Sequence, residues 1–498
     1  MRQNNLFLRG KTLVFPTLCI GIMTLASCAD VYDGDEVYSS DVRNETMVSP
    51  DAAKITVTAS TDGTQQTIAW PVVYGAGGYE LIVTDVTDPG NTIEIMNKNV
   101  DGCSVTLARD EDRNYTLSLR TLGDKELNNK DAETAATLQF TTFLPSVGTI
   151  PAGSDIADYF AENSIPESAA TEMVCYDLVP GGMYTLNRLV EFANKKVTIR
   201  TASANKATVV YGAEGKITTY TGCTLKNLNI DCSAQTSSTA SVIQLSETPD
   251  ESIKGIQKEG EYKSTYYDIQ DNIVLQGLNI QGLPGYIFFD GNKVAYGLRA
   301  LTVKDCVIEL VTSSEHSVKE NALINSYKGF IKDFSMMNTT IWTNPTTAKG
   351  KAKFMIRYNN SGRPDRYGYA KASVNFSNST FYNVCKGGQW ANYDGIGNAH
   401  KWAVFNMQSC IFLDCGNKDV ARRFIRNKPA AADDITFKNN TYMYEGDFEN
   451  DEYDTSGTAI KSDPQFENAA SGNFKVNGSE QLAKRTGDPR WLPEVEAE

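Results

Sequence analysis

Histidine is almost absent from this sequence: its 498 residues include two, His316 and His400. This scarcity argues against a histidine-rich metal site, and no paired Cys-x-x-Cys spacing offers a zinc site instead. No internal run approaches the roughly 20 apolar residues that a membrane-spanning helix needs. Basic residues are outnumbered by acidic ones, and the formal net charge is −14. The sequence therefore predicts no metal site and no resident cofactor.

The one long apolar run lies at the N-terminus, where basic residues precede TLVFPTLCIGIMTLASC. A basic segment followed by an apolar one is typical of a signal peptide. The run ends in LASC (25–28), which resembles the lipobox of bacterial lipoproteins. The resemblance implies that residues 1–28 are a lipoprotein signal and that lipid on Cys28 anchors the chain to the outer membrane. An ordinary signal peptide cut nearby is the alternative.

Residues 29–50 are predicted to form a flexible acidic tether. Asp30, Asp33, Asp35 and Glu36 closely follow Cys28. This pattern is similar to the acidic export signal of surface lipoproteins in Bacteroidota, which implies the outer face of the outer membrane. A solvated, charged spacer is the simpler interpretation, and the two are compatible.

Seven short strand-like runs fill residues 51–145: KITVTAS, QQTIAWPVV, GYELIVTDV, NTIEIMN, CSVTLA, NYTLSLRTLG and ATLQFTTF. Turn signals such as Asp62-Gly63 separate several of them, and seven alternating strands in this length predict a β-sandwich. The segment resembles a fibronectin type III domain, with Trp70 at the core tryptophan position and Tyr115 at the tyrosine-corner position. We find no chemistry-bearing pattern here and expect a spacer or docking module.

Residues 155–498 contain a recurring phrase: LKNLNI, LQGLNI, VKDCVI, MMNTTI, FSNSTF, MQSCIF and FKNNTY. Their third positions are residues 227, 277, 305, 338, 378, 409 and 439, at intervals from 28 to 50 residues. Such a period, with strand-rich units and polar turns, predicts stacked repeats that bury a shared apolar column. We therefore predict a parallel β-helix, whose third position suits a left-handed turn. A propeller, the competing architecture, would need blades of about 40–50 regular residues.

Both ends of this repeat domain carry closing signals. SDIADYFAEN, at the end of the linker PSVGTIPAGSD (145–155), predicts a capping helix with Ser154 or Asp155 as its N-cap. The segment from SDPQFENAASGNFKV to GDPRW resembles the C-terminal closing segment of β-helix proteins. The whole arrangement resembles Bacteroidota lipoproteins from polysaccharide-utilisation loci that join a fibronectin-like module to a pectate-lyase-like right-handed β-helix. The resulting fold class is all-β.

The cysteines left after Cys19 and Cys28 number eight. A protein of the cell envelope can form disulfides, but several of these residues lie in apolar strand patterns that favour buried thiols. Cys385 and Cys415 lie at similar points of consecutive repeats, and the sequence leaves open whether they pair.

A basic segment interrupts the acidic chain. Residues 319–428 hold 17 Lys plus Arg against 6 Asp plus Glu, a balance of +11, so the rest carries −14 − 11 = −25. Within it, FMIRYNNSGRPDRYGY (354–369) combines three arginines with three tyrosines. Such a segment points to an anionic partner, whereas lysines that merely solubilise loops are the plain alternative. Nucleic acid fits the composition, but not an exported protein without a nucleic-acid motif.

Stacking would bring the basic and aromatic residues between the repeat phrases to one side of successive coils. Arginine binds carboxylates through paired hydrogen bonds, and aromatic rings stack on sugar faces. We predict a groove for an acidic, pectin-like polysaccharide, delivered to outer-membrane glycan uptake proteins. The candidate glycan-binding residues are Tyr327, Lys328, Arg357, Tyr358, Arg363, Arg366, Trp390, Arg423 and Arg426.

A non-catalytic binding protein is favoured, and a polysaccharide lyase or hydrolase of the β-helix kind is the alternative. RPDRYG (363–368) partly matches the pectate-lyase phrase RxPxxRxG, but its spacing differs. If the protein is a lyase, Arg363, Arg366 and Lys386 are the residues to test, and Ca²⁺ is the expected cofactor. The six acids of the basic segment are scattered and form no calcium spacing or clear glycosidase pair.

Overall fold

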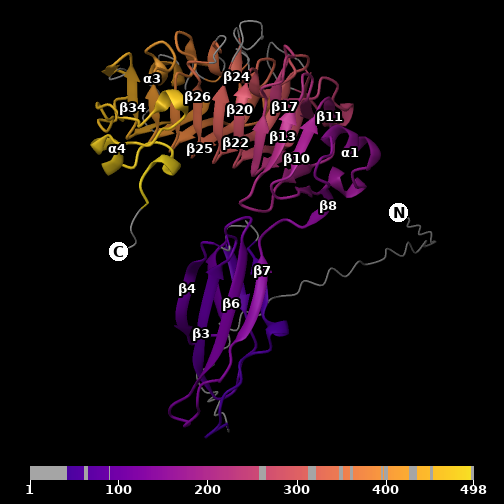
Figure 1. The fold of residues 1–498 in the computed structure, drawn as a ribbon, viewed down its shortest axis with the longest axis vertical. Coiled ribbons are helices and arrows are strands. Elements are labelled where there is room, and N and C mark those ends of the chain that lie inside the picture. Colours follow the sequence, from indigo (N-terminus) through magenta and orange to yellow (C-terminus); the bar gives the residue numbers. More distant parts are fainter. Residues whose placement is uncertain are drawn as a thin grey trace, which may run out of the picture. The chain divides into compact units, whose positions relative to one another are not determined.

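We analysed a computed structural model of the chain (Figure 1). It describes residues 42–60, 65–88, 90–256, 265–311, 321–346, 351–358, 363–393, 396, 402–425, 434–448 and 452–494. The signal segment, with Cys28, and both histidines lie outside these ranges. The described residues form two compact units. The first holds those up to Val83 with Ile95–Ala108 and Leu117–Leu138, and the second holds Thr84–Glu94, Arg109–Thr116 and everything from Gln139 onward.

All seven strands predicted before residue 145 are present. One sheet has the order β1-β2-β5 and is antiparallel, and the other has the order β4-β3-β6-β7. Their bounds are β1 Thr56–Ala59, β2 Gln65–Ala69, β3 Ala76–Asp85, β4 Ile93–Val100, β5 Ser104–Ala108, β6 Asn114–Gly123 and β7 Ala136–Thr141. Trp70 packs edge-on against Tyr79 at 5.4 Å, so side chains from both sheets share one core. The β-sandwich prediction is confirmed, whereas membership of the fibronectin family stays a prediction.

The rest of the described chain winds through three parallel sheets, which we name A, B and C in the order that each coil visits them (Figure 1). Sheet A contains β8 (Ser146–Ile150), β9 (Val174–Leu178), β12 (Val197–Arg200), β15 (Cys223–Lys226), β19 (Thr265–Gln276), β22 (Tyr296–Lys304), β25 (Phe330–Met337), β28 (Ala372–Ser377), β31 (Ala403–Gln408) and β33 (Ile435–Lys438), with β18 (Lys254–Ile256) antiparallel to β19. Sheet B contains β10 (Met183–Leu186), β13 (Ala207–Tyr211), β16 (Leu228–Asp231), β20 (Asn279–Leu283), β23 (Val307–Leu310), β26 (Thr340–Thr343), β29 (Thr380–Tyr382), β32 (Ile411–Leu413), β34 (Thr441–Tyr444) and β35 (Asp447–Phe448). Sheet C contains β11 (Leu189–Glu191), β14 (Lys216–Thr219), β17 (Ser241–Leu245), β21 (Tyr286–Phe289), β24 (Ala322–Ser326), β27 (Phe354–Tyr358) and β30 (Gln389–Asn392). This is the predicted parallel β-helix.

Burial differs between the sheets. Strands β17 and β24 of sheet C are buried at every residue. Strands β28 and β31 of sheet A alternate instead between buried and half-buried residues, which leaves one face partly open. Parallel strands covered on both faces tend to be uniformly apolar. A site on sheet C is therefore enclosed, whereas a site on sheet A lies on a partly exposed surface.

The turn from sheet A to sheet B repeats one backbone geometry. All seven third positions of the repeat phrase have a left-handed backbone, as predicted. Their φ angles are 54° for Asn227, 63° for Gly277, 56° for Asp305, 48° for Asn338, 45° for Asn378, 50° for Ser409 and 53° for Asn439. Glycine, asparagine and aspartate adopt this conformation most readily, which explains why they recur there.

A second ladder lies one residue further along, where the sequence analysis did not expect one. The side chain of Thr339 accepts a hydrogen bond from the backbone N–H of Cys306 at 3.3 Å, and Ser379 accepts one from Thr339 at 3.2 Å. Asn440 does the same for Cys410 at 3.0 Å. All five residues are buried. The ladder therefore satisfies polar groups inside the stack and ties each coil to the next.

Short helices pack at the ends of the stack, and the closing segment lies against sheet B. Helix α1 (Ile156–Glu162) begins at the N-cap Asp155, as predicted, and packs on β10 and β11. Helix α3 (Val420–Phe424) packs against β30, and α4 (Ser479–Ala483) lies in the closing segment. That segment is fixed to sheet B through Thr340, whose hydroxyl donates to Asp488 and accepts from Trp491, both at 2.8 Å.

The eight cysteines of the described chain form no disulfides, and all except Cys103 are buried. The question left open for Cys385 and Cys415 is therefore answered as unpaired thiols, and burial raises the pKa of both. None of the described helices combines the length and apolar character needed to cross a membrane.

Candidate functional site

The predicted glycan-binding residues that the structure describes lie on sheet C, on its connections to sheet A and, for Arg423, on helix α3. Tyr327 and Lys328 are exposed in the turn after β24. Arg357 and Tyr358 end β27, and Trp390 lies in β30. Three of the four predicted segments meet in parallel, in-register strands, with Asn325 beside Arg357. The fourth, which contains Arg423, forms helix α3 instead.

For Tyr358 and Trp390 the prediction is wrong. Both side chains have no exposed surface, so neither can present a ring to a ligand. Trp390 lies among phenylalanines of the core, including Phe381 and Phe412, each 5.0 Å away between ring centroids. In a repeat protein, aromatic residues often pack in the core between the sheets. The local sequence does not distinguish such a buried aromatic residue from one on the surface.

Arg357 is the predicted residue with the most distinctive environment. Its guanidinium carbon lies 4.0 Å from the centre of the Tyr327 ring, and its Nη1 donates to the side-chain oxygen of Asn321 at 2.8 Å. A cation in this position is attracted by the ring face, and the stacked guanidinium is held in one orientation. Arg357 and Tyr327 thus form a rigid cationic and aromatic unit beside the exposed Lys328.

Buried polar atoms without partners lie in the same sheet as this unit. Asn325 is 1% exposed, yet neither atom of its amide has a hydrogen-bond partner among the described residues. Nε of Arg357 and the side-chain oxygen of Gln244 are also buried and unpaired there. Gln244, Asn325 and Arg357 belong to one row of sheet C, with Phe289 between the first two. Buried unpaired polar groups cost about 1–3 kcal/mol each, so a ligand or water that pairs them is favoured.

The other predicted arginines are engaged within the chain. Arg363 makes two hydrogen bonds to Asp365, at 3.0 and 2.6 Å, and this pairing lowers the pKa of Asp365. Arg423 donates to Asp419 at 3.1 Å. Arg366 also has interactions within the chain, and Arg426 lies outside the described residues. The excess of positive charge counted along the segment is therefore partly neutralised where it folds.

The lyase-like phrase RPDRYG forms a short 3-10 turn, Pro364–Tyr367, beside the paired Arg363. Lys386, the third residue considered for a lyase, pairs with Asp414 at 3.1 Å. Among the described residues, no group of three or more His, Cys, Asp or Glu side chains is placed to hold a metal ion.

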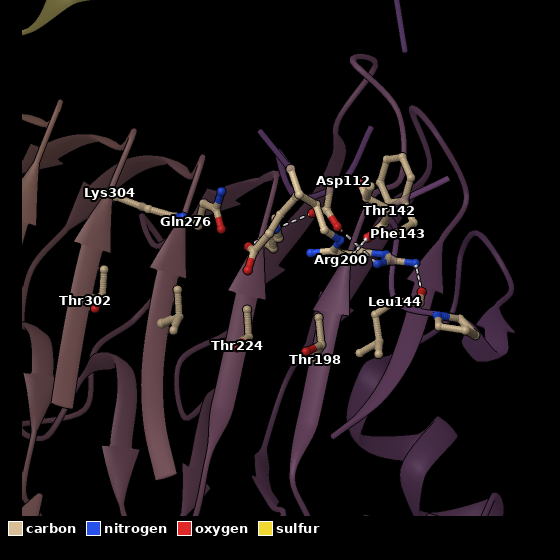
Figure 2. Close-up of a pocket in the computed structure, with 15 residues that line it drawn as sticks. Asp112, Thr142, Phe143, Leu144, Thr198, Arg200, Thr224, Gln276, Thr302 and Lys304 are labelled. Atoms are coloured by element: carbon tan, nitrogen blue, oxygen red, sulfur yellow. Dashed lines mark hydrogen bonds and ion pairs between the residues drawn. The ribbon is translucent and has the colours of Figure 1, made fainter. Parts of the chain in front are cut away.

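Sequence analysis missed a pocket of about 500 Å³ on the face of sheet A (Figure 2). Every residue that lines it belongs to the second unit. Its floor comes from the C-terminal halves of β12, β15, β19 and β22. One in-register row across these strands is Thr198, Thr224, Val274 and Thr302, and the next is Arg200, Lys226, Gln276 and Lys304. Hydroxyl, amide and cationic groups therefore face one cavity.

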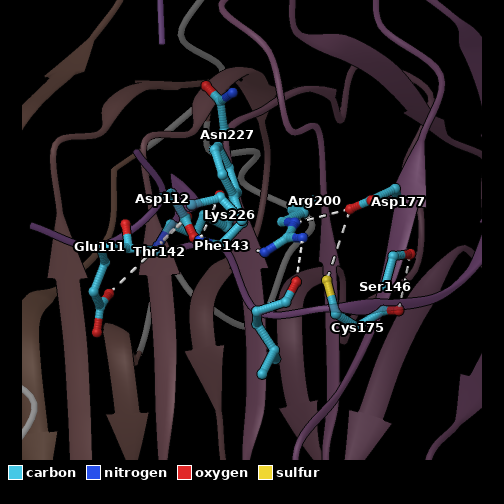
Figure 3. A network of polar contacts seen from close by, with 12 residues as sticks. Glu111, Asp112, Thr142, Phe143, Ser146, Cys175, Asp177, Arg200, Lys226 and Asn227 are labelled. Carbon is cyan, nitrogen blue, oxygen red and sulfur yellow. Dashed lines mark hydrogen bonds and ion pairs between the residues drawn. The ribbon is translucent and has the colours of Figure 1, made fainter. Parts of the chain in front are cut away.

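A network of ion pairs closes one end of this pocket (Figure 3). Arg200, which is 3% exposed, donates to Asp177 at 2.8 Å and to the backbone oxygen of Leu144 at 2.6 Å, and it lies 3.5 Å from Asp112. Lys226 pairs with Asp112 as well. Arg200 thus fixes the chain at residue 144 to the first coils of the stack.

Replacing Arg200 with alanine is expected to destabilise the protein by about 2 kcal/mol, because it leaves Asp177 and Asp112 without their buried partner. We reduce the usual penalty for breaking a buried pair because both carboxylates are partly exposed, at 23% and 18%. Urea unfolding provides the measurement. Arg188→Ala, which breaks an exposed pair with Asp158, is the control and should change stability by less than about 1 kcal/mol. Equal effects of both variants would contradict a special role for Arg200.

Three family models match the chain, and each is described as a domain of unknown function. They are DUF4992 over residues 1–180, DUF4957 over residues 182–344 and DUF5123 over residues 334–491. Each covers less than half of the chain, and none describes an activity. No curated protein matched the sequence.

Among solved structures, the chain is similar to pectate lyases. Pectate lyase PelI from Erwinia chrysanthemi, in complex with tetragalacturonic acid, is 7% identical over 79% of this chain and 90% of its own, with a TM-score of 0.17. Pectate lyase Pel3 from Pectobacterium carotovorum is 8% identical over 80% of this chain and 92% of its own, with a TM-score of 0.18. At these scores the similarity supports no inference about the site, and the β-helix assignment rests on the strand pairing described above.

Proposed function

We propose that this protein is a non-catalytic, lipid-anchored binding protein for an acidic polysaccharide of the pectin kind. In this proposal Cys28 carries the lipid, the N-terminal sandwich is a fibronectin-like spacer, and the β-helix holds the sugar chain at the cell surface. The binding residues are Arg357, Tyr327 and Lys328, beside the row of sheet C that contains Asn325.

The observation that carries the proposal is the stacking of Arg357 on Tyr327, next to the buried amide of Asn325, which lacks partners. A fixed guanidinium binds a carboxylate through charge-assisted hydrogen bonds. The tyrosine, which is 38% exposed, offers ring surface to the apolar face of a sugar. Together these groups provide what a uronic acid residue requires: a cation, a ring surface and amide hydrogen-bonding groups.

The test is affinity electrophoresis of the chain without its signal segment, in gels with and without polygalacturonate. We expect retardation of the wild type, and a dissociation constant at least about tenfold weaker for Arg357→Ala, because one charge-assisted contact contributes about 1.4 kcal/mol or more. Arg357→Lys keeps the charge but loses the planar guanidinium and should fall between the two.

Arg188→Ala is the control, because Arg188 is an exposed arginine that pairs with Asp158 of helix α1 and is not in the row of sheet C that contains Asn325 and Arg357. Its mobility should match that of the wild type. Unchanged retardation of Arg357→Ala would refute the proposed site, and no retardation of any variant would refute the ligand class. Clearing of the gel around the band would show that the protein degrades polygalacturonate, and would contradict a non-catalytic function.

A further inference from the structure

We infer that the pocket on sheet A is a second binding site, for a short segment of an acidic oligosaccharide, separate from the site around Arg357. The pocket lies over β12, β15, β19 and β22, whereas Arg357 lies on β27 of sheet C. The inference does not need the Arg357 site to exist, since it rests on different residues.

The geometry supplies two kinds of contact in parallel rows (Figure 2). Thr198, Thr224 and Thr302 place hydroxyl groups along one row, each on a different strand. Gln276 and Lys304 lie in the neighbouring row and have no ion-pair or side-chain hydrogen-bond partner among the described residues. Neighbouring strands are about 4.8 Å apart, so four strands span about 14 Å. This length accommodates about three sugar rings laid across the strands.

The charge of the residues that line the pocket favours an acidic sugar. The pocket is lined by the cations Arg109, Arg200, Lys226 and Lys304 and by two acids, Glu111 and Asp112. The balance is 4 − 2 = +2, in a chain whose net charge is −14. Arg200 and Lys226 already pair with Asp112, and Arg109 donates to the backbone oxygen of Thr142 at 3.2 Å. Lys304 is therefore the lining cation best placed to receive a carboxylate. Threonine hydroxyls and the Gln276 amide would then bind the ring hydroxyls of the same oligosaccharide.

The sequence offers a matched control for Lys304. Lys304 directly precedes the left-handed turn residue Asp305, and Lys438 holds the equivalent place before Asn439 on β33. Lys438 does not line the pocket. A change at Lys438 therefore alters the same kind of position, and the net charge by the same amount, away from the proposed site.

The experiment is calorimetric titration of trigalacturonate into the full chain without its signal segment, in an Arg357→Ala background. We expect binding to persist in this background and to weaken at least tenfold when Lys304→Glu is added. Thr302→Val, which removes one hydroxyl from a half-buried strand position, should weaken it several-fold. Lys438→Glu should leave it unchanged. Circular dichroism confirms that each variant is folded.

Several outcomes would overturn the inference. These are an absence of trigalacturonate binding in the Arg357→Ala background, equal effects of Lys304→Glu and Lys438→Glu, and binding of inorganic sulfate but not of trigalacturonate. The first outcome leaves the Arg357 site standing. If Arg357→Ala instead binds like the wild type while Lys304→Glu loses binding, the sheet A site is supported and the proposed site at Arg357 fails.

Discussion

Replacing Trp390 with alanine is expected to lower the free energy of unfolding by about 3–5 kcal/mol, the usual cost of deleting a large aromatic side chain from a core. Trp390 has no exposed surface and packs against Phe376, Phe381 and Phe412, which come from sheets A and B. The truncation opens a cavity at the place where the three sheets meet. Urea unfolding followed by circular dichroism measures the change.

Tyr327→Ala is the matched control. Like Trp390, Tyr327 is an aromatic residue of the sheet C side of the stack, but its side chain is 38% exposed. We expect it to change the free energy of unfolding by less than about 1 kcal/mol, since it leaves no cavity. A small effect of Trp390→Ala, with weaker polysaccharide binding, would contradict the burial described here. It would restore the sequence-based prediction that Trp390 is a ligand contact.

The stability of the protein is expected to fall by about 4 kcal/mol as pH rises from about 4 to about 7, through the titration of Asp290 alone. Asp290 follows β21, has no exposed surface, and accepts hydrogen bonds from the backbone of Asn292 at 3.0 Å and Lys328 at 2.9 Å. Burial raises the pKa of its carboxyl to about 7, and these hydrogen bonds offset only part of the rise.

In the unfolded chain an aspartate titrates near pH 3.9, about three units lower. Between these values the folded protein holds a proton that the unfolded chain has released. Stability from this group is therefore complete below about pH 4 and is lost as pH rises, at about 1.4 kcal/mol for each unit. Urea titrations at pH 4.5, 5.5, 6.5 and 7.5 should show a fall in stability that is steeper in the wild type than in Asp290→Asn, with the difference between the two following this slope.

Asp155→Asn is the control for this slope. Although burial favours the neutral form of Asp155, hydrogen bonds from Thr185 and from backbone N–H groups lower the pKa of its carboxyl below the usual value. Its contribution is therefore present above about pH 4 and is lost only at lower pH. The stability of Asp155→Asn should run parallel to that of the wild type from pH 4.5 to 7.5. Parallel curves for Asp290→Asn would contradict the assignment.

The repeat phrase was sufficient to predict the β-helix. Its third position demands a left-handed backbone, and a residue type that tolerates this conformation is visible in sequence wherever it recurs. Asn227 and Asn439, at the two ends of the series, both have this geometry. The ladder one residue later was not predicted, because Cys306, Thr339 and Asn440 share no residue type. What they share is that each can be buried while its polar groups form a hydrogen bond to the next coil.

The site was less predictable, for a related reason. Tyr327 and Tyr358 belong to equally aromatic segments, yet the first is 38% exposed and the second is buried. Composition gives the number of aromatic residues in a coil but does not show which of them are buried between the sheets. Charge has the same limitation: Arg363 counts as a cation in the sequence, but the fold places Asp365 against it.

One signal in the repeat phrases went unused. The residue before each turn position is Lys226, Gln276 and Lys304 in the first three phrases, so a polar, mainly cationic column is visible once the phrases are aligned. Together with Arg200, these residues form the row of the sheet A pocket that carries the cations and the amide. A charge count along the chain detects runs such as residues 319–428, whereas the residues of this column recur at intervals of 50 and 28 residues.

The ends of the stack also bear on solubility. A coil without a successor exposes unpaired backbone N–H and C=O groups on each of its sheets, and such an edge is a template for joining another chain. Sheet C ends at β30, against which α3 packs, and sheet B ends in the antiparallel strand β35. These elements interrupt the parallel pairing that a second molecule would have to continue. At the C-terminal ends of sheets B and C, the fold therefore opposes the end-to-end joining of two molecules.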